Sequence, residues 1–194
     1  LNNEKKFIPD ALNLGILNSN SEYIIRLDAH TVYSADYINK CIETIKNSPA
    51  DVVNVGGIIK TVSTQNNIVG NAIADVLSSK FGVGNSIFRV SVPNKNVYVD
   101  TVPFGCFKKS IFDEIGLFNV KQHRNEDLEF NYRIVKNSKK IILNPEIVSM
   151  YYVRDDFKKL IKQQFHNGLI VTNRIGLDGL FHSLRHFVPL LWIL

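Results

Sequence analysis

Two polar side chains follow a short apolar run in the segment Tyr23–Tyr33, Y-I-I-R-L-D-A-H-T-V-Y. The apolar residues from Tyr23 onward are typical of a buried strand, and Asp28 and His30 come soon after it. Such groups are costly to bury without a partner. A carboxylate and an imidazole two residues apart can bind one divalent cation or line one diphosphate, and the imidazole shifts the metal preference from Mg²⁺ towards Mn²⁺. The alternative is structural: Asp28 caps the following turn and His30 lies on the surface.

A second group of carboxylates lies in R-N-E-D-L-E, residues 124–129. Read structurally, Asn125 caps a helix, and the acids of its first turn complement the helix dipole. Read functionally, Asp127 or Glu126 is a general base for a substrate hydroxyl, kept ionised by the helix N-terminus. The pattern alone leaves both interpretations open.

Two glycine-containing segments could bring backbone close to a ligand. Gly105 in V-P-F-G-C follows a strand and permits close approach, while Phe104 could stack on a sugar or belong to the core. The loop F-G-V-G-N, residues 81–85, has Arg89 nearby. It has neither the Walker pattern nor G-x-G-x-x-G, so it is a weak candidate for a phosphate-binding loop.

The elements expected to position these residues alternate between helix and strand. Such alternation predicts a mostly parallel sheet with helices on both faces, and ligands that bind beyond the carboxyl ends of the strands. Caps are expected at Ser34 and Asn125. Helices are expected at about 10–19, 35–47, 68–80, 109–115, 126–136 and 156–175, and strands or extended segments at 23–28, 51–59, 97–102, 140–143 and 147–153.

Composition limits the class of protein and its partners. The chain has 194 residues, 45% of them hydrophobic and 21% charged, as expected of a folded globular protein. A net charge of +5 suits an anionic partner such as a nucleotide, a phosphorylated lipid or a membrane surface. No nucleic-acid recognition module is visible. Cys41 and Cys106 have no metal-type spacing and are predicted to be reduced core residues.

The C-terminal part is apolar in two places. Residues 155–170 are amphipathic, with Phe157, Leu160, Ile161 and Phe165 on one face, which fits either a membrane surface or the domain itself. The uncharged run 187–194 is too short to span a membrane, so it is either a tail or the first part of a longer transmembrane helix, which we favour. The chain starts at Leu1 and its only methionine is Met150, so we do not expect Leu1 to be the native start.

The order of the motifs resembles family 2 glycosyltransferases, and within them the bacterial exopolysaccharide branch of succinoglycan-type glucosyltransferases. The resemblance covers essentially the whole chain, and the combination is specific although no single motif is. It rests on A-L-N-L-G-I, E-Y-I-I-R-L-D-A-H, V-G-G, G-V-G-N…F-R, Y-V-D-T-V-P-F-G, I-G-L-F-N, R-N-E-D-L-E-F-N-Y-R-I and Q-Q-F-H-N-G.

This resemblance implies a GT-A fold, a three-layer α/β/α sandwich, with an inverting mechanism, a nucleotide-sugar donor, expected to be a UDP-sugar, and a divalent metal, Mn²⁺ or Mg²⁺. Asp28 and His30 stand where the family has its D-x-D motif, with His30 in place of the second aspartate. Asp127 matches the catalytic base of the family's E-D motif, supported by Glu126. Further residues are expected at the donor (Asn13, Gly15, Gln164, His166) and on the acceptor side (Phe104, Gly105, Arg124).

The resemblance also predicts what the chain lacks. It begins at A-L-N-L-G-I, so residues 1–175 would be the C-terminal two-thirds of the catalytic domain, inactive alone, and 176–194 a linker and the start of a hydrophobic segment. The expected setting is the cytoplasmic face of a bacterial inner membrane, with a saccharide or lipid-linked acceptor, possible homodimers and no nucleic acid. The alternatives are a non-catalytic module that binds a glycan or partner, and a metal-dependent hydrolase.

Overall fold

The computed structural model describes residues 1–65, 67–84, 86–122, 125–153, 156–158, 160–162 and 165. The chain divides into two compact units, each built from two stretches of sequence. Unit 1 comprises Leu1–Ile59 and Val92–Ser149, and unit 2 comprises Lys60–Ser91 and the chain from Met150 onward. The acidic segments around Asp28 and Glu126 both belong to unit 1.

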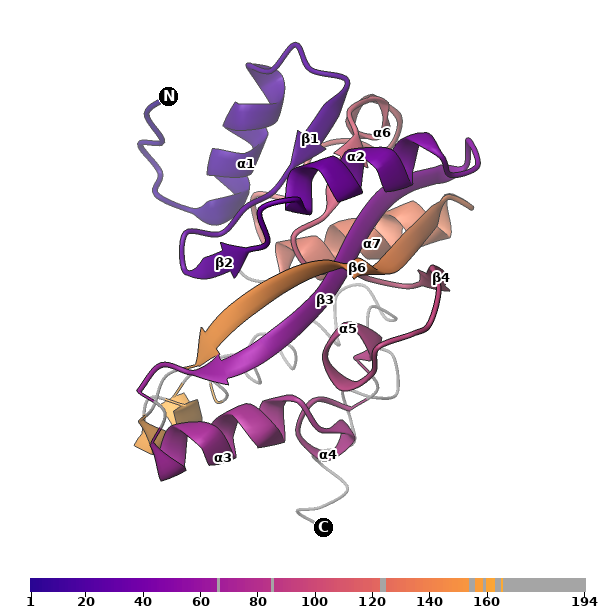
Figure 1. The fold of residues 1–194 in the computed structure, drawn as a ribbon. Helices are drawn as coiled ribbons and strands as arrows, with labels where there is room; N and C mark the ends of the chain where they lie inside the picture. The colour runs from indigo at the N-terminus through magenta and orange to yellow at the C-terminus, as the bar shows by residue number, and fades with distance from the viewer. Residues whose placement is uncertain are drawn as a thin grey trace. The chain divides into compact units, whose positions relative to one another are not determined.

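Six strands form one sheet (Figure 1): β1 (Tyr23–Ile25), β2 (Thr31–Tyr33), β3 (Val52–Ser63), β4 (Val97–Val99), β5 (Cys106–Lys108) and β6 (Lys140–Val153). The order is β1-β5-β3-β6-β2, and β4 pairs with β6. β5 is antiparallel to both β1 and β3, with Cys106 opposite Ile25 and Val55, so β1 and β3 run in the same direction. β4 is antiparallel to β6. The sheet is therefore mixed, whereas the sequence predicted a mostly parallel one.

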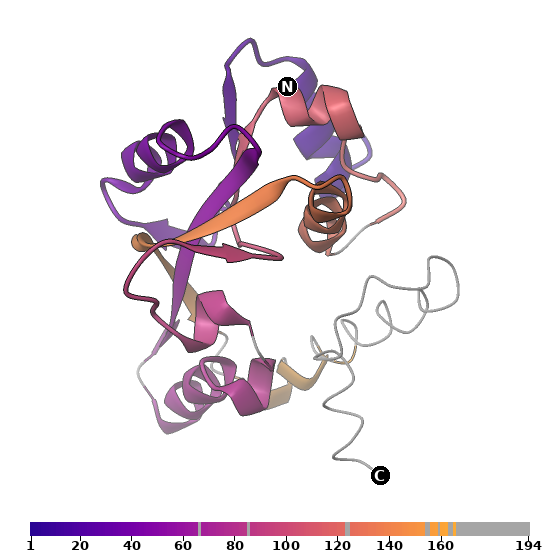
Figure 2. The same cartoon turned by 90° about the vertical axis from the view of Figure 1, so that its right-hand side faces the viewer.

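The helices with defined bounds are α1 (Ile8–Leu17), α2 (Tyr37–Lys46), α3 (Ile68–Leu77), α4 (Lys80–Val83), α5 (Ile87–Val90), α6 (Ser110–Ile115) and α7 (Glu126–Lys136), and the described residues between 157 and 165 are also helical. In unit 1, α2 and α7 lie on opposite faces of the sheet, as the two views of Figures 1 and 2 show. This layering confirms the predicted α/β fold class.

An aromatic cluster fixes α7 in unit 1. The buried positions of α7 recur every three or four residues, which is the spacing of one helix face. On that face Phe130 is fully buried, and its ring centroid lies 4.6 Å from that of Phe118, 4.9 Å from that of Phe112 and 5.5 Å from that of Phe107. Because these rings come from β5, α6 and the loop after α6, the cluster sets where the first turn of α7 lies.

Buried hydrogen bonds fix the orientation of the elements that pack together in unit 1. The Asn54 amide on β3 donates to Asn131 Oδ1 at 2.8 Å, and the Asn131 amide donates to Thr101 Oγ1 at 2.9 Å. Asn13 on α1 donates to the Phe118 carbonyl at 2.8 Å and accepts from the Phe118 amide at 2.9 Å. Each pair satisfies groups that would be costly to leave unpaired in the interior. Together they connect α1, β3 and α7 through specific hydrogen bonds.

Several predicted elements differ from the structure. β6 is one strand through Asn144 and Pro145, where a break was predicted; Asn144 Oδ1 accepts from the Glu146 amide at 2.8 Å and bridges the proline. Ser34 does not cap α2, which begins at Tyr37 after Asp36. Four short elements, β2, β5, α4 and α5, were not predicted, because three or four residues are too few to show a period.

Asn125 does not cap α7 through its side chain, contrary to the sequence prediction. It holds the N-cap position with a left-handed backbone, φ 56°, and without a side-chain hydrogen bond to the first turn. Its carbonyl accepts from the Glu129 amide at 3.1 Å. A left-handed asparagine turns the chain sharply at the point where the two acids of the E-D motif begin the helix.

The two cysteines are core residues, as predicted. Cys41 and Cys106 are both free thiols with no exposed surface. Burial raises the pKa of each thiol to about 12, so both are protonated and poorly reactive at neutral pH.

Part of the predicted amphipathic helix lies within the described residues of unit 2. Leu160 packs against the small core cluster of Ile73, Ala74 and Val153. Phe157, Ile161 and Phe165, predicted to share its face, are exposed. Within the described residues, no helix has the length and apolar character needed to cross a bilayer, and the run 187–194 lies outside them.

The aromatic cluster leads to a stability prediction. Phe130→Ala removes the ring that contacts three other phenylalanines, and we expect a loss of ~4 kcal/mol in the free energy of unfolding, measured in urea. Val135→Ala on the same helix is the matched control, because Val135 is exposed and should change the free energy by less than ~0.5 kcal/mol. Equal effects of the two substitutions would contradict the packing described for α7.

Candidate active site

One arginine joins the two acidic segments of the sequence. Arg26, directly after β1, directs its guanidinium between them: Nε donates to Asp28 Oδ1 at 3.0 Å, and Nη1 donates to Glu126 Oε1 at 2.7 Å. Nη2 reaches the second oxygen of Asp28 at 3.4 Å. The Arg26 and Glu126 side chains are only 12% and 5% exposed, so these are buried, charge-assisted contacts. Residues 100 positions apart thereby form one site.

The backbone around Asp28 is held from two sides. The Arg26 amide donates to the Gly105 carbonyl at 3.1 Å, and the Thr31 amide donates to the Asp28 carbonyl at 3.2 Å, closing a turn. The Asp28 amide donates to Tyr33 Oη at 2.7 Å. These bonds fix the direction in which the chain leaves β1, and with it the Asp28 carboxylate.

Glu126 and Asp127 differ in exposure, as their predicted roles require. Glu126 is buried and paired with Arg26, whereas Asp127 is half-buried. Burial, and then the neighbouring Asp127 carboxylate, raise the pKa of Glu126 above its ordinary value, although Arg26 opposes both. Asp127 Oδ1 accepts from the Leu128 amide at 2.8 Å. Glu126 thus pairs with Arg26 in the interior, while part of the Asp127 side chain stays open.

The site carries excess negative charge. Burial lowers the pKa of Arg26, but Asp127, Asp28 and Glu126 outweigh it and raise that pKa above its ordinary value. Three carboxylates therefore surround one guanidinium. Such a site attracts a cation and keeps a carboxylate available as a base.

His30 lies in the exposed turn after Asp28. Within the described residues, no cluster of three or more histidine, cysteine or acidic side chains is close enough to hold a metal by itself. Within that part of the chain, Asp28 and His30 would therefore supply at most two protein ligands to a cation, and its remaining ligands would have to come from elsewhere.

Gly105 and Phe104, predicted on the acceptor side, are both buried. A Cβ on Gly105 would lie 2.4 Å from Asn54 Oδ1, so the glycine is required by the core rather than by a ligand. Phe104 has φ 47°, its carbonyl accepts from Tyr37 Oη at 3.0 Å, and its ring packs edge-on against Tyr33 at 5.6 Å. Both residues support the turn that holds Asp28.

The residues predicted at the donor fall into three groups. Asn13 uses both amide atoms on the Phe118 backbone and so has a structural task. Gly15 lines a cavity on α1. Gln164 and His166, together with the acceptor-side Arg124, lie outside the described residues.

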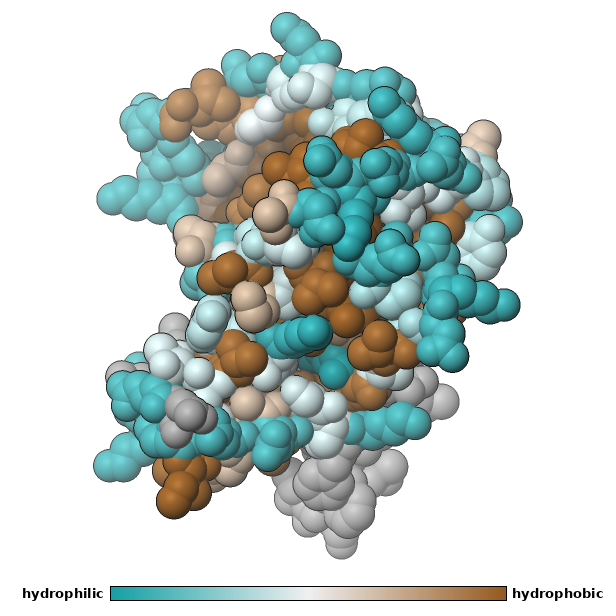
Figure 3. All heavy atoms as spheres, viewed as in Figure 1, coloured by the Kyte–Doolittle hydropathy of each residue, from teal (hydrophilic) through white to brown (hydrophobic). Residues whose placement is uncertain are grey.

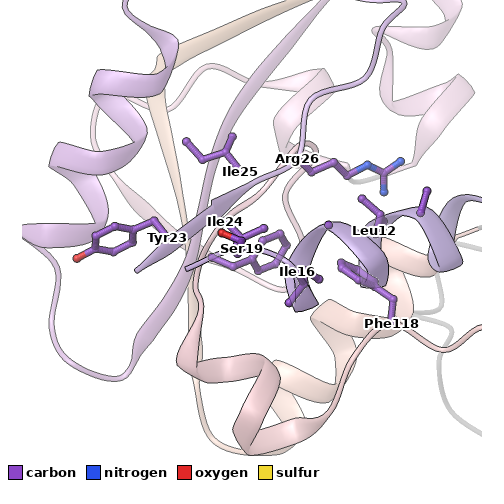
Figure 4. A pocket seen from close by; sticks show the side chains of 11 residues that line it. Leu12, Ile16, Ser19, Tyr23, Ile24, Ile25, Arg26 and Phe118 are labelled. Carbon is purple, nitrogen blue, oxygen red and sulfur yellow. The ribbon is translucent and has the colours of Figure 1, made fainter. Parts of the chain in front are cut away.

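The cavity of unit 1 lies between α1 and β1 and has a volume of about 360 Å³. On the face in Figure 3, hydrophobic side chains gather over this region. Figure 4 shows Tyr23 and Arg26 at opposite ends of the lining, with Leu12, Ile16 and Phe118 along it. The lining is mostly apolar, and its one charged residue, Arg26, belongs to the acidic site.

Arg26 and Tyr33 are the residues that sequence reasoning missed. The sequence contained a feature that could have identified Arg26, because an arginine inside an apolar run needs a buried counter-charge. It contained no such feature for Tyr33, because a tyrosine beside a short strand is ordinary in a core.

Comparison with known proteins relates the chain to glycosyltransferases. The model of glycosyl transferase family 2 matches residues 1–116. A dolichyl N-acetyl-alpha-D-glucosaminyl phosphate 3-beta-D-2,3-diacetamido-2,3-dideoxy-beta-D-glucuronosyltransferase of Methanococcus voltae is 34% identical, over 86% of this chain and 51% of its own length. The succinoglycan biosynthesis protein ExoA of Rhizobium meliloti (strain 1021) is 28% identical, over 98% of this chain and 56% of its own. The chain thus spans about half the length of these relatives.

A solved structure supports the fold. GalNAc-T7, crystallised with UDP, GalNAc and Mn²⁺, superposes on 97% of this chain and 41% of its own, with a TM-score of 0.57 and 11% identity. At that identity the similarity concerns the fold alone, which is GT-A.

The Arg26 bridge leads to a pH-dependent prediction. Arg26→Met leaves the buried Glu126 without its cation, and breaking such a pair from one side should lower the free energy of unfolding by ~3 kcal/mol at neutral pH. The loss should shrink as the pH falls, because the unpaired Glu126, its pKa raised further, takes up a proton in the folded state before it would in the unfolded chain. Urea unfolding at several pH values measures both effects.

Two variants control this experiment. Adding Glu126→Gln to Arg26→Met should recover most of the loss at neutral pH, since no buried charge then remains at position 126. Lys139→Met breaks the more exposed pair with Glu114 and should have a much smaller effect. A pH-independent loss in Arg26→Met, no larger than that of Lys139→Met, would show that Arg26 does not bridge the site.

Proposed function

The chain belongs to glycosyltransferase family 2, and from this premise we propose that the full-length protein transfers a sugar from a nucleotide-sugar donor to a lipid-linked or saccharide acceptor, inverting the anomeric carbon. A UDP-sugar is the donor we expect. The lipid-linked acceptor is supported by the name of the Methanococcus relative, which specifies a dolichyl sugar phosphate, and the polysaccharide setting by that of the Rhizobium relative.

The observation that carries the proposal is the bridge of Arg26 between Asp28 and Glu126. It brings the segment that resembles the donor motif to the segment that resembles the base motif. A transferase needs such a pairing, because the leaving diphosphate and the attacking hydroxyl must meet at one carbon.

In this mechanism Asp127 takes the proton of the acceptor hydroxyl. The hydroxyl oxygen forms a bond to the anomeric carbon while the bond from that carbon to the diphosphate breaks on the opposite face. One displacement of this kind inverts the anomeric configuration. Glu126, held by Arg26, lies beside Asp127 and supports it, while the Arg26 guanidinium keeps Asp28 pointed towards the diphosphate side.

We propose Asp28 and His30 as the protein ligands of a divalent cation, with Mn²⁺ favoured by the mixed oxygen and nitrogen donors. The negative charge around Arg26 fits such an ion. When bound there, the ion would neutralise charge on the departing diphosphate.

We also propose that this chain alone binds donor weakly. Its described residues supply carboxylates for the diphosphate and the base, and the cavity beside them is mostly apolar, without a set of polar groups for a nucleoside. Sugar transfer should therefore be measured with the full-length protein.

Unit 2 supports a position at a membrane surface. Phe157, Ile161 and Phe165 are between half and two-thirds exposed, and lysines accompany them at 158 and 162. Exposed apolar side chains with neighbouring lysines are typical of a helix on an anionic membrane.

The base assignment is tested by Asp127→Asn in the full-length protein. Because the amide cannot accept the acceptor proton, we expect the transfer rate to fall at least ~100-fold with little change in KM for the donor. The rate is measured with a panel of nucleotide sugars in the presence of Mn²⁺. Asp113→Asn is the matched control: Asp113 is an exposed acid on α6, and its loss should leave the rate within about twofold of wild type.

A full rate in Asp127→Asn would refute the base assignment. No transfer by the wild-type full-length protein, with binding of glycans intact, would instead favour a non-catalytic glycan-binding module.

A further inference from the structure

Arg89 is a partly buried cation in unit 2, far along the chain from the acidic site. It lies on the short helix α5, and its Cζ is 5.4 Å from the ring centroid of Tyr151 and 5.8 Å from that of Phe88. Its Nη1 donates to Thr61 Oγ1 at 3.3 Å. Burial lowers the pKa of Arg89, with Tyr151 opposing. The surroundings of the guanidinium are thus two aromatic rings and one hydroxyl.

Arg89 differs from the other arginines that the structure describes. Arg26 pairs with Asp28 and Glu126, and Arg133 pairs with Glu129 at 2.7 Å. No ion pair joins Arg89 to a carboxylate within the described residues. A guanidinium has five N–H donors, and Thr61 accepts from one of them. Burying a charge is unfavourable, and the described residues provide no carboxylate that compensates Arg89. An anionic ligand would recover a large share of that energy.

The chain before α5 positions Arg89, and its conformation depends on two glycines, Gly82 and Gly84. A Cβ on Gly82 would lie 2.1 Å from the Val76 carbonyl oxygen, so α4 packs on the end of α3 only with glycine there. Gly84 has φ 61° and ψ −142°, a backbone conformation open to glycine alone, and it turns the chain from α4 towards α5. The glycine-bearing loop singled out in the sequence therefore positions the arginine.

The surface of unit 2 suits an anion attached to a lipid. Its described residues include five basic side chains and only two acidic ones, Asp75 and Asp156. α3 exposes Ile68 at 89%, Val69 at 45% and Val76 at 47%. Exposed apolar residues next to an excess of positive charge are what an anionic lipid headgroup with its hydrocarbon chain requires.

We propose that unit 2 carries an anion-binding site centred on the Arg89 guanidinium, which takes the phosphate group of a lipid-linked acceptor. Thr61 Oγ1 fixes one edge of the guanidinium, and the planar fork offers its remaining donors to two phosphate oxygens. The choice of a lipid phosphate, rather than a free phosphate, rests on the proposed function; the anion site itself does not. The site anchors the acceptor and takes no part in proton transfer.

The test is equilibrium binding of the chain to vesicles, which requires no catalysis. Phosphatidylcholine vesicles that contain a small fraction of polyprenyl phosphate are compared with vesicles of phosphatidylcholine alone and with vesicles of matched charge that contain phosphatidylserine. We expect wild type to prefer the polyprenyl phosphate vesicles and Arg89→Gln to bind them at least tenfold more weakly. Arg89→Lys, which keeps the charge but not the fork, should lose several-fold.

Lys80→Gln is the matched control, because Lys80 is an exposed cation in the same unit and should change binding by no more than about twofold. Thermal unfolding checks that Arg89→Gln folds, and Arg89→Lys carries the test if it does not. Equal losses of vesicle binding in Arg89→Gln and Lys80→Gln would overturn the Arg89 site in favour of general surface charge. Wild-type binding by Arg89→Gln would overturn it as well. If Arg89→Gln does not fold, wild-type binding by Arg89→Lys has the same meaning. If inorganic phosphate competes fully for the site and wild type does not prefer the polyprenyl phosphate vesicles, the proposal that the bound phosphate belongs to a lipid is overturned. Asp127→Asn should bind these vesicles like wild type. A failure of the Arg89 site in this binding test is therefore distinguishable from a failure of the proposed transfer reaction.

Discussion

The interaction on which the site depends is the double contact of Arg26 with Asp28 and Glu126. Without a cation between them, the half-buried Asp28 and the buried Glu126 would repel each other. Arg26 compensates both carboxylates, and Asp127 lies beside them with more of its surface open. One guanidinium therefore does two things: it connects the end of β1 to the start of α7, and it leaves the site with net negative charge.

The rest of unit 1 holds the two ends of that contact in place. On one side, the Gly105 carbonyl and Tyr33 fix the backbone from Arg26 to Asp28. On the other, Phe130 and Asn131 attach α7 to the sheet through the aromatic cluster and the bonds to Asn54 and Thr101. These supports are buried and specific, which is what precise placement of catalytic groups requires.

The sequence predicted the parts of this fold that have long, regular patterns. The helix at 126–136 has the bounds of α7, and the strand predicted at 51–59 overlaps β3 from Val52 onward. The pairing of D-A-H with E-D was predicted only through the resemblance to a family, because nothing local relates residues 100 positions apart. Arg26 escaped for the same reason: its partner Glu126 is distant in the chain. Gly105 and Asn13 were predicted at ligands, and the structure shows that they also have packing and hydrogen-bonding roles, which a sequence cannot reveal.

A double-mutant cycle between Asp28 and Glu126 tests most directly whether the two segments form one site. Free energies of unfolding are measured for wild type, Asp28→Asn, Glu126→Gln and the double variant at neutral pH. Either acid alone still leaves Arg26 one directly paired carboxylate, and the double variant leaves none. The account therefore predicts that the double variant loses more than the sum of the single losses, by at least ~1 kcal/mol. Additive losses, within ~0.5 kcal/mol, would mean that Arg26 does not couple the two carboxylates, and would contradict the account.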